Sequence, residues 1–299
     1  MERTRSYAAT TASQLFHQVV DAIRSRRNVD HEVSILLSRL QRDEARITAK
    51  LGRPLRGLDV LEIGPGQHCE RSGYLGRSNR VTGIDLDVIP QLGRIQDYVR
   101  MLRANGAGRL LKTLGRKALL VDRTRRRAWE RAAGSKTVAP KLLSGDVCSQ
   151  PLPSASFDVV CTWSVFEHLP DPARAVKNVV QALRPGGVSL IGVHLYTSNS
   201  GHHDIRAFTG AGRFLPLWGH LRPTTEHAIA PSSFLNRWRL AEWRRLFGEE
   251  MPGHQEFLED YGAAELRALM TPALRRELDV FTDEELFTVD AFYAWQKPR

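Results

Sequence analysis

The sequence predicts an α/β fold in which helices alternate with the strands of a mostly parallel, doubly wound sheet. Five short apolar runs of strand length recur between residues 58 and 196, as is typical of strands buried on both faces. Turn residues bound these runs, and a helical pattern separates the last two. The chain has 299 residues, of which 42% are hydrophobic and 25% charged. This composition excludes wholesale disorder. The length fits one elaborated domain or two small ones.

Residues 1–57 are predicted to form a helical cap before the main domain, which we place at 58–299. Apolar residues recur at helical spacing in two runs between residues 12 and 51. Asp30 is expected to cap the second run at its N-terminus, and Gly52 with Pro54 is expected to end it.

The main domain is expected to hold strands at 58–63, 81–85, 142–146, 157–163 and 187–196, with a last strand near 289–296. A helix is expected between the fourth and fifth strands, because Asp171 can cap it and Pro172 suits its first position. Pro185, Gly186 and Gly187 are expected to end that helix. Another helix is expected from about Ser232 to Phe247, ended by Gly248.

The positive charge of the chain is concentrated between residues 90 and 141. This segment holds 14 of the 43 Lys and Arg residues and only three acids, so its net charge is +11, whereas the whole chain carries +10. It lies between the second and third expected strands and is much longer than a crossover needs. We therefore predict a basic insertion with one or two amphipathic helices.

The first expected strand runs into a glycine-rich turn, Glu62-Ile63-Gly64-Pro65-Gly66. Glycines at this turn allow the backbone to approach a ligand closely. Asp85 ends the next strand about 20 residues later, the position at which an acid accepts hydrogen bonds from ribose hydroxyls. Cys69 replaces the third glycine of a dinucleotide loop, and no P-loop lysine follows. An acid two residues before the first glycine suits a nucleoside cofactor that carries an ammonium group.

These motifs resemble the class I S-adenosylmethionine-dependent methyltransferases of the small-molecule, type 11-like branch. LDVLEIGPG (58–66) resembles their first motif, GID (83–85) the end of their second strand, and 145–191 their third to fifth motifs in unbroken order. The resemblance covers residues 58–196 without the basic insertion. It implies a Rossmann-like seven-stranded sheet, S-adenosylmethionine as cofactor and methyl transfer as the activity.

The resemblance also implies a role for each matching residue. Expected to line the methionine part of the cofactor are Glu62, Gly64 and Gly66. Asp85 is expected to bind the ribose, and Asp87 is the less suitable alternative because it does not follow the strand directly. The adenine would be bound by Asp146 and Val147, and Ser164 would close over the cofactor. Asp146 also suits a structural turn. His68 stands at the family's third glycine, so the loop must bend differently or His68 must point into the cleft.

Three histidines are candidate catalytic residues, because imidazole can accept a proton from a hydroxyl at neutral pH. They are His168, after the fourth strand, His194, near the end of the fifth, and His203 in the following loop. A metal site of His194, His203 and Asp204 is an alternative. Its spacing matches no compact helical ligand pair, so no metal is predicted.

The methyl acceptor is expected to be a small molecule or a glycan or lipid intermediate, methylated at oxygen. Residues 197–248 would contribute a loop and a lid helix to its pocket. The Asn/Asp-Pro-Pro-Tyr turn of DNA amino-methyltransferases is absent after the fourth strand. The basic insertion suits peripheral contact with an anionic membrane. An RNA methyltransferase and a cofactor-binding scaffold without turnover are alternatives.

Localisation is predicted from three absences in the sequence. No apolar run approaches the ~20 residues of a membrane span, the N-terminus has no signal-peptide core, and the three cysteines have no CxxC spacing. We expect a cytoplasmic protein, and the sequence leaves its oligomeric state open.

Overall fold

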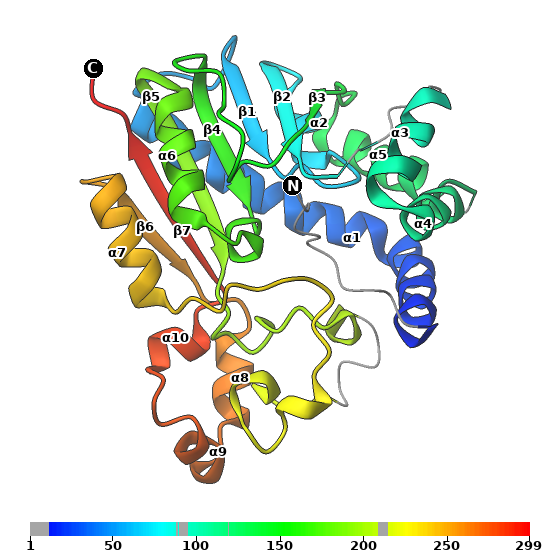
Figure 1. Ribbon diagram of the computed structural model, residues 1–299, viewed down its shortest axis with the longest axis vertical. Helices are drawn as coiled ribbons and strands as arrows, with labels where there is room; N and C mark the ends of the chain where they lie inside the picture. The colour runs from blue at the N-terminus through cyan, green and yellow to red at the C-terminus, as the bar shows by residue number, and fades with distance from the viewer. Residues whose placement is uncertain (1–11, 88, 90–94, 119, 209–214) are drawn as a thin grey trace. The chain divides into compact units, whose positions relative to one another are not determined.

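The computed structural model describes residues 12–87, 89, 95–118, 120–208 and 215–299. Seven strands form one sheet in the order β3-β2-β1-β4-β5-β7-β6 (Figure 1). They are β1 (Asp59–Ile63), β2 (Arg80–Asp85), β3 (Lys141–Ser144), β4 (Phe157–Trp163), β5 (Leu183–His194), β6 (Gln255–Glu259) and β7 (Asp290–Gln296). The predicted mostly parallel, doubly wound sheet is confirmed. The predicted strands are found within a few residues of their expected bounds, whereas β6 was not predicted because its sequence, QEFLE, has no apolar run.

The parallel half of the sheet brings the carboxyl ends of three strands together. β1 pairs in parallel with β2 and with β4, so that Ile63 lies beside Ile84 on one side and Thr162 on the other. Val60 and Val159 face each other in this register and are fully buried. In a doubly wound sheet the ligand crevice lies outside the carboxyl ends of such strands.

The last strand along the chain reverses direction. The Gly186 N–H donates to the Lys297 carbonyl, and the Lys297 N–H donates to the Gly187 carbonyl. At the other end of the pair, the Leu195 N–H donates to the Val289 carbonyl. Residue numbers therefore rise along β5 while they fall along β7, so the two strands are antiparallel. This pair differs from the pairs among β1, β2, β3 and β4, which are parallel.

The chain divides into two compact units. Unit 1 comprises Met1–Asp21, Trp163–Ala173 and Ile191–Tyr293, and unit 2 comprises Ala22–Thr162, Arg174–Leu190 and Ala294–Arg299. The described helices are α1 (Ala12–Leu51), α2 (Glu70–Leu75), α3 (Ile95–Asn105), α4 (Ala107–Ala118), α5 (Val121–Ala133), α6 (Pro172–Ala182), α7 (Leu240–Glu250), α8 (Ala263–Leu269), α9 (Pro272–Glu277) and α10 (Asp283–Phe287). Short 3-10 turns are η1 (Phe166–His168), η2 (Ile205–Phe208), η4 (Gly219–Leu221) and η5 (Glu226–Ala228).

The N-terminal helical region is one helix and not two. α1 continues through Asp30, because residues 12–51 contain neither glycine nor proline to interrupt it. Asp30 is therefore not an N-cap, and its carboxylate pairs with Arg131 of α5 at 2.5 Å. Gly52 has a φ of 66° and follows the last helical residue, as expected of a helix C-terminus. Residues 1–11 of the predicted cap lie outside the described residues.

The basic insertion forms three helices, one more than the upper number predicted. α5 is anchored within unit 2, because Arg125 pairs with Glu70 of α2 and with Glu32 of α1. Trp129 of the same helix is buried 6.1 Å from the Tyr74 ring, centroid to centroid. Residues 90–94 and 119 of the insertion lie outside the described residues.

In unit 1, the helix predicted at 232–247 begins eight residues later than expected. α7 starts at Leu240 and runs through Gly248 to Glu250. Residues 232–239 are extended or irregular because their donors are used elsewhere. Asn236 donates from its side chain to the Phe166 carbonyl at 2.9 Å and from its backbone to the Glu167 carbonyl, also at 2.9 Å. These bonds compete with helix formation.

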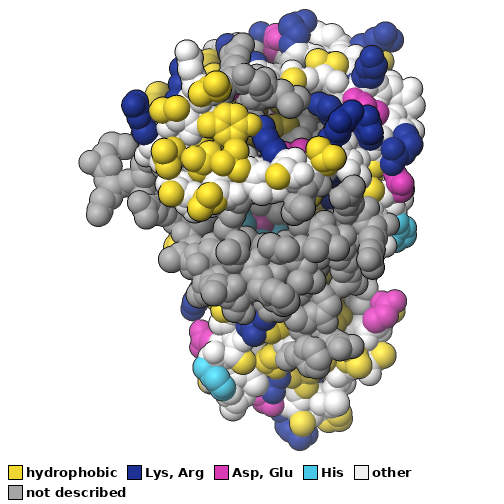
Figure 2. Space-filling view, turned by 90° about the vertical axis from the view of Figure 1, so that its right-hand side faces the viewer, with side chains coloured by type: hydrophobic (Ala, Val, Ile, Leu, Met, Phe, Trp, Pro, Cys, Tyr) yellow, Lys and Arg dark blue, Asp and Glu magenta, His cyan; other side chains and the backbone are white. Residues whose placement is uncertain are grey.

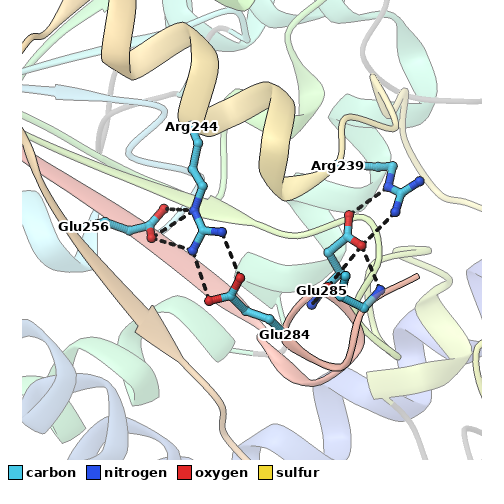
Figure 3. A network of polar contacts seen from close by, with 6 residues as sticks. Arg239, Arg244, Glu256, Glu284 and Glu285 are labelled. Atoms are coloured by element: carbon cyan, nitrogen blue, oxygen red, sulfur yellow. Dashed lines mark hydrogen bonds and ion pairs between the residues drawn. The ribbon is translucent and has the colours of Figure 1, made fainter. Parts of the chain in front are cut away.

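Ion pairs fix α7 to the C-terminal elements of unit 1 (Figure 3). Arg244 binds Glu256 of β6 and Glu284 of α10, with shortest distances of 2.7 and 2.8 Å. Arg239, just before α7, binds Glu285 at 2.7 Å. A small apolar core of the same unit includes the buried side chains Trp218, Leu278, Leu286 and Phe287. Among the described residues, no helix is long and apolar enough to span a membrane.

Candidate active site

The turn after β1 is held to the end of β2 by backbone contacts. Gly64 and Gly66 have φ values of 69° and 66°, in the left-handed region that favours glycine. The Gly64 N–H donates to the Ile84 carbonyl at 2.8 Å. A Cβ placed on Gly66 would meet no atom within 4 Å, so the backbone of this turn borders open space. That is what a turn that approaches a ligand requires.

Asp85, the last residue of β2, closes the turn from the other side. Its two carboxylate oxygens accept hydrogen bonds from the backbone N–H groups of Gly66 (3.3 Å) and Asp87 (2.9 Å). Burial raises the pKa of Asp85 to about 6. The alternative acid, Asp87, instead pairs with Arg109 of the insertion at 2.8 Å. The contact with Gly66 favours Asp85 as the acid of the glycine turn.

Glu62 is buried in β1 with 2% of its surface exposed. Its carboxylate accepts a hydrogen bond from the Ser72 hydroxyl of α2. Burial raises the pKa of Glu62 to about 7, and the Ser72 hydrogen bond opposes this shift only in part. A cationic group at this turn would favour the ionised form of Glu62.

The predicted adenine-binding residues have local partners of their own. The Asp146 carboxylate accepts from the Cys148 N–H at 2.8 Å and from the Ser149 hydroxyl at 3.1 Å, which closes the turn after β3. The Val147 carbonyl accepts from the Asn178 side chain at 2.7 Å. The alternative structural role of Asp146 is therefore observed, and its contact with adenine stays a prediction.

His68 is paired with the insertion. Its Nδ1 lies 3.2 Å from the carboxylate of Asp122, which also pairs with Arg116 at 2.6 Å. The next residue, Cys69, has a φ of 48°, so the turn bends through a left-handed residue where the family has glycine nearby. His68, Cys69 and Trp129 help line a cavity of about 420 Å³ between this turn and the insertion. The cavity lies entirely within unit 2.

Unit 1 brings the three predicted catalytic histidines together. The ring of His203 lies 4.7 Å from that of His168 and 5.0 Å from that of His194, and both ring pairs are nearly perpendicular. We call these three residues the histidine cluster. His168 follows β4 in η1, and His194 is the last residue of β5. His203 has a left-handed φ of 49°, an uncommon conformation for a residue with a side chain.

His194 is the histidine of the cluster that an acid orients. Its Nδ1 lies 2.9 Å from the Asp290 carboxylate, and its Nε2 lies 3.0 Å from the Ser200 hydroxyl. Burial lowers the pKa of His194, but the hydrogen bond and the charge of Asp290 outweigh burial, so the pKa is raised overall. In contrast, burial lowers the pKa of His168, and that of His203 to about 2.

Glu167 lies at the centre of the histidine cluster and was not predicted as a site residue. Its side chain is 2% exposed, and among the described residues neither oxygen has a hydrogen-bond partner of good geometry. Burial raises its pKa to about 8, against the opposing charge of His194. The one feature of the sequence that could have identified Glu167 as a site residue is its position next to His168. Asp290 offered none, because 96 residues separate it from His194.

Other polar residues of the loop after β5 are structural. The Asp204 carboxylate accepts from the Arg206 side chain and from the Ala230 N–H, so it does not join His194 and His203. The alternative metal set of His194, His203 and Asp204 is therefore wrong. Ser164 of unit 1 is exposed and has a left-handed φ of 54°. Its N–H donates to the Gly192 carbonyl. That Ser164 closes over the cofactor stays a prediction. Residues 209–214 of the predicted pocket loop lie outside the described residues.

Residues 103–191 match a family model described as a methyltransferase domain. This stretch of the chain is therefore similar to a methyltransferase domain. The match confirms the family resemblance seen in the sequence, and it covers β3, β4 and the residues up to Ile191 of β5. The cofactor that the family implies is S-adenosylmethionine.

The chain is also similar to curated proteins and to solved structures. A probable S-adenosylmethionine-dependent methyltransferase of Mycolicibacterium smegmatis is 49% identical over 47 residues, which cover 16% of this chain and 18% of the relative. The chain thus aligns with less than a fifth of that protein. Phosphoethanolamine N-methyltransferase 2 of Haemonchus contortus is 15% identical (TM-score 0.47; 86% of this chain, 53% of that one). A methyltransferase of Mesorhizobium loti is 16% identical (TM-score 0.44; 81% and 92%).

The residues of the glycine turn fit S-adenosylmethionine. The open space beside Gly66 admits a ligand close to the backbone. Glu62 is a buried carboxyl that a ligand ammonium group would ionise, and Asp85 offers carboxylate oxygens for two ribose hydroxyls. These residues precede the stretch that matches the family model, and they would bind and orient the cofactor.

The raised pKa of Glu62 predicts how stability changes with pH. Between pH 4.5 and 7, folded Glu62 holds a proton that the unfolded chain has released, so the free energy of unfolding falls as pH rises through this window. Glu62→Gln cannot ionise and should exceed the wild-type stability by about 3 kcal/mol at pH 8, and by little at pH 4.5. Urea unfolding of the cofactor-free chain at both pH values measures this. Glu249→Gln, at an exposed position, is the control and should follow the wild type. Equal pH dependence in Glu62→Gln and wild type would show the prediction to be wrong.

Proposed function

We propose that this chain transfers a methyl group from S-adenosylmethionine to a hydroxyl of a membrane-associated lipid or glycan-lipid intermediate. The observation that carries the proposal is the histidine cluster, in which His194 is oriented by Asp290. Bound S-adenosylmethionine supplies an activated sulfonium methyl group. The protein therefore has to align the acceptor and take up its proton.

His194 has the geometry of a proton acceptor. Because its Nδ1–H donates to Asp290, the lone pair lies on Nε2, which faces the Ser200 hydroxyl. An acid, a histidine and a hydroxyl in this order form the arrangement that removes a hydroxyl proton in hydrolases. His194 also stands at the carboxyl end of β5, where ligands of doubly wound folds bind. A hydroxyl acceptor needs such a base, whereas a thiol or an amine needs it less.

The surface of the basic insertion supports a membrane-associated acceptor. Ile95, Val99 and Leu102 recur along α3, and Leu111 and Leu114 along α4, and all five are exposed. Ile95 is 79% and Leu111 68% exposed. Figure 2 shows the face that includes α3 and α4, where hydrophobic side chains gather beside Lys and Arg side chains. Exposed aliphatic side chains among basic ones suit the interface of an anionic bilayer. An RNA backbone is bound chiefly through charge, so the exposed aliphatic side chains favour a bilayer over RNA.

Methyl-labelled S-adenosylmethionine tests the proposed function. The full chain is incubated with labelled cofactor and separate lipid, soluble small-molecule, RNA and protein fractions of a source-cell extract. We expect label in the lipid fraction, stable to treatments that remove methyl esters. Label in RNA alone would overturn the proposal in favour of the alternative enzyme class. Binding of S-adenosylhomocysteine without label in any fraction would favour a non-catalytic scaffold.

The same preparation tests the role of α3 and α4. The double variant Ile95→Glu/Leu111→Glu changes two exposed side chains and should fold normally. We expect its binding to phosphatidylglycerol-containing vesicles, measured by cosedimentation, to fall at least about tenfold. Gln replacement at exposed Leu269 of α8 is the control and should leave vesicle binding unchanged. If the double variant binds vesicles as well as the wild type, the insertion is not the membrane contact.

A further inference from the structure

A buried carboxylate without hydrogen-bond partners lies within the histidine cluster. Among the described residues, both oxygens of Glu167 and the Nε2 of His203 are buried and lack a hydrogen bond. Buried polar atoms are rarely left unsatisfied, and several such atoms at one place indicate a missing ion or water. All the residues concerned belong to unit 1.

The ring of His168 is oriented so that it too can bind a ligand. Its Nδ1 lies 2.8 Å from the Phe234 carbonyl, which can only accept, so Nδ1 carries the proton and Nε2 the lone pair. Nε2 is the nitrogen nearer to Glu167, at 3.9 Å from Oε1. A histidine that binds a metal through one nitrogen usually donates the other N–H to a backbone carbonyl or carboxylate.

The three ligand atoms are spaced for one ion. The Glu167 Oε1 lies 3.9 Å from the His168 Nε2 and 4.0 Å from the His203 Nε2, and the three atoms lie within 4.8 Å of one another. A point equidistant from the corners of such a triangle is about 2.3–2.5 Å from each of them. Zinc binds nitrogen and carboxylate oxygen at about 2.0–2.2 Å. A shift of a few tenths of an ångström in each side chain would reach these distances.

We propose that Glu167, His168 and His203 bind a divalent transition-metal ion, for which zinc is a suitable probe. Two imidazoles and one carboxylate form a ligand set of catalytic zinc and of iron(II) sites, in which positions remain open for further ligands. The ligand expected at an open position is an oxygen donor of the methyl acceptor. That part of the inference rests on the proposed function, whereas metal binding itself does not.

The neighbouring residues support the choice of these three ligands. His194 is not one of the three ligands, because its Nδ1 contacts Asp290 and its Nε2 faces the Ser200 hydroxyl. The metal site therefore leaves the proposed proton acceptor unchanged. Asp204 is engaged by Arg206. The left-handed backbone of His203 is the kind of strained conformation that is found at functional sites.

Metal content and spectroscopy test the site without any measurement of methyl transfer. The full chain is purified without a histidine tag, stripped with chelator and titrated with Zn²⁺ by calorimetry. The Co²⁺-loaded chain is then examined by visible absorption. We expect one Zn²⁺ per chain, and cobalt bands typical of nitrogen and oxygen ligands. Affinity should fall at least about 100-fold in Glu167→Gln and His203→Ala, because loss of a direct ligand should exceed the 10- to 100-fold effect of an outer partner.

A matched control and a folding check keep the test decisive. His227→Ala removes an exposed histidine of the same unit and should leave zinc affinity unchanged. Glu167→Gln preserves the shape of the side chain, and thermal melting without metal shows whether each variant folds. Equal zinc affinity in the wild type and in folded Glu167→Gln and His203→Ala would overturn the proposal. So would failure of the wild type to bind Zn²⁺ when about 100 µM Zn²⁺ is present at about twice the chain concentration. A metal-binding chain that labels no acceptor fraction would leave the site standing and count against the proposed function alone.

Discussion

His194→Asn should lower the rate of methyl transfer by about 100- to 10,000-fold, the range that a general base contributes. The structural reason is the pair with Asp290, which fixes the proton on Nδ1 and leaves Nε2 to accept the proton of the acceptor hydroxyl. Asn keeps a hydrogen bond toward Asp290 but cannot take up a proton. The measurement is the initial rate of label transfer from methyl-labelled S-adenosylmethionine into the lipid fraction that serves the wild type.

Two further variants separate a role in proton transfer from a role in packing. Asp290→Asn leaves the histidine in place but favours the wrong tautomer, so it should also lose at least about 100-fold in rate. His220→Asn removes a buried histidine whose Nε2 contacts the Tyr196 carbonyl at 2.6 Å, and it should lose less than about fivefold. All three variants should bind S-adenosylhomocysteine as the wild type does. A rate for His194→Asn within about threefold of that for His220→Asn would exclude His194 as the base.

The glycine turn was predictable because its parts are close in sequence or follow adjacent strands. Glu62, Gly64 and Gly66 lie within five residues, and parallel pairing of β1 with β2 brings Asp85 to the same edge of the sheet. An apolar run that ends in glycine specifies both the strand and the turn. For this reason the sequence could assign Asp85 and the glycine turn to one ligand, although it did not predict the hydrogen bond from Gly66 to Asp85.

The histidine cluster was predictable only as separate candidates. His168 and His194 could be placed at strand ends, but the contacts of Glu167 and Asp290 depend on a loop of irregular backbone and on strand β7. Periodicity carries no information about such contacts. The same limit explains the error at 232–247, where apolar spacing favoured a helix and hydrogen bonds from Asn236 to the loop after β4 decided against it.

Asp85→Asn should weaken the binding of S-adenosylhomocysteine about 100-fold. A hydrogen bond to a charged acceptor contributes roughly 1.5–3 kcal/mol, and the loss of two bonds to ribose hydroxyls at the lower figure is about 3 kcal/mol, or about 100-fold in Kd. The substitution also places an NH₂ group opposite a backbone N–H, either that of Gly66 or that of Asp87, since both donate to the carboxylate. Titration calorimetry at pH 8, where Asp85 is ionised, measures the change.

The neighbouring acid makes this prediction selective. Asp87→Asn removes a carboxylate two residues away that pairs with Arg109, so it should change the Kd by less than about threefold. Unfolding should not account for the loss in Asp85→Asn. Because burial raises the pKa of Asp85 to about 6, its charge is a cost to the folded chain at pH 8, and a neutral amide removes that cost. If Asp87→Asn weakened binding more than Asp85→Asn, the ribose-binding acid would be Asp87. The cofactor would then be bound by an acid that pairs with Arg109 of the insertion, and not by the last residue of β2.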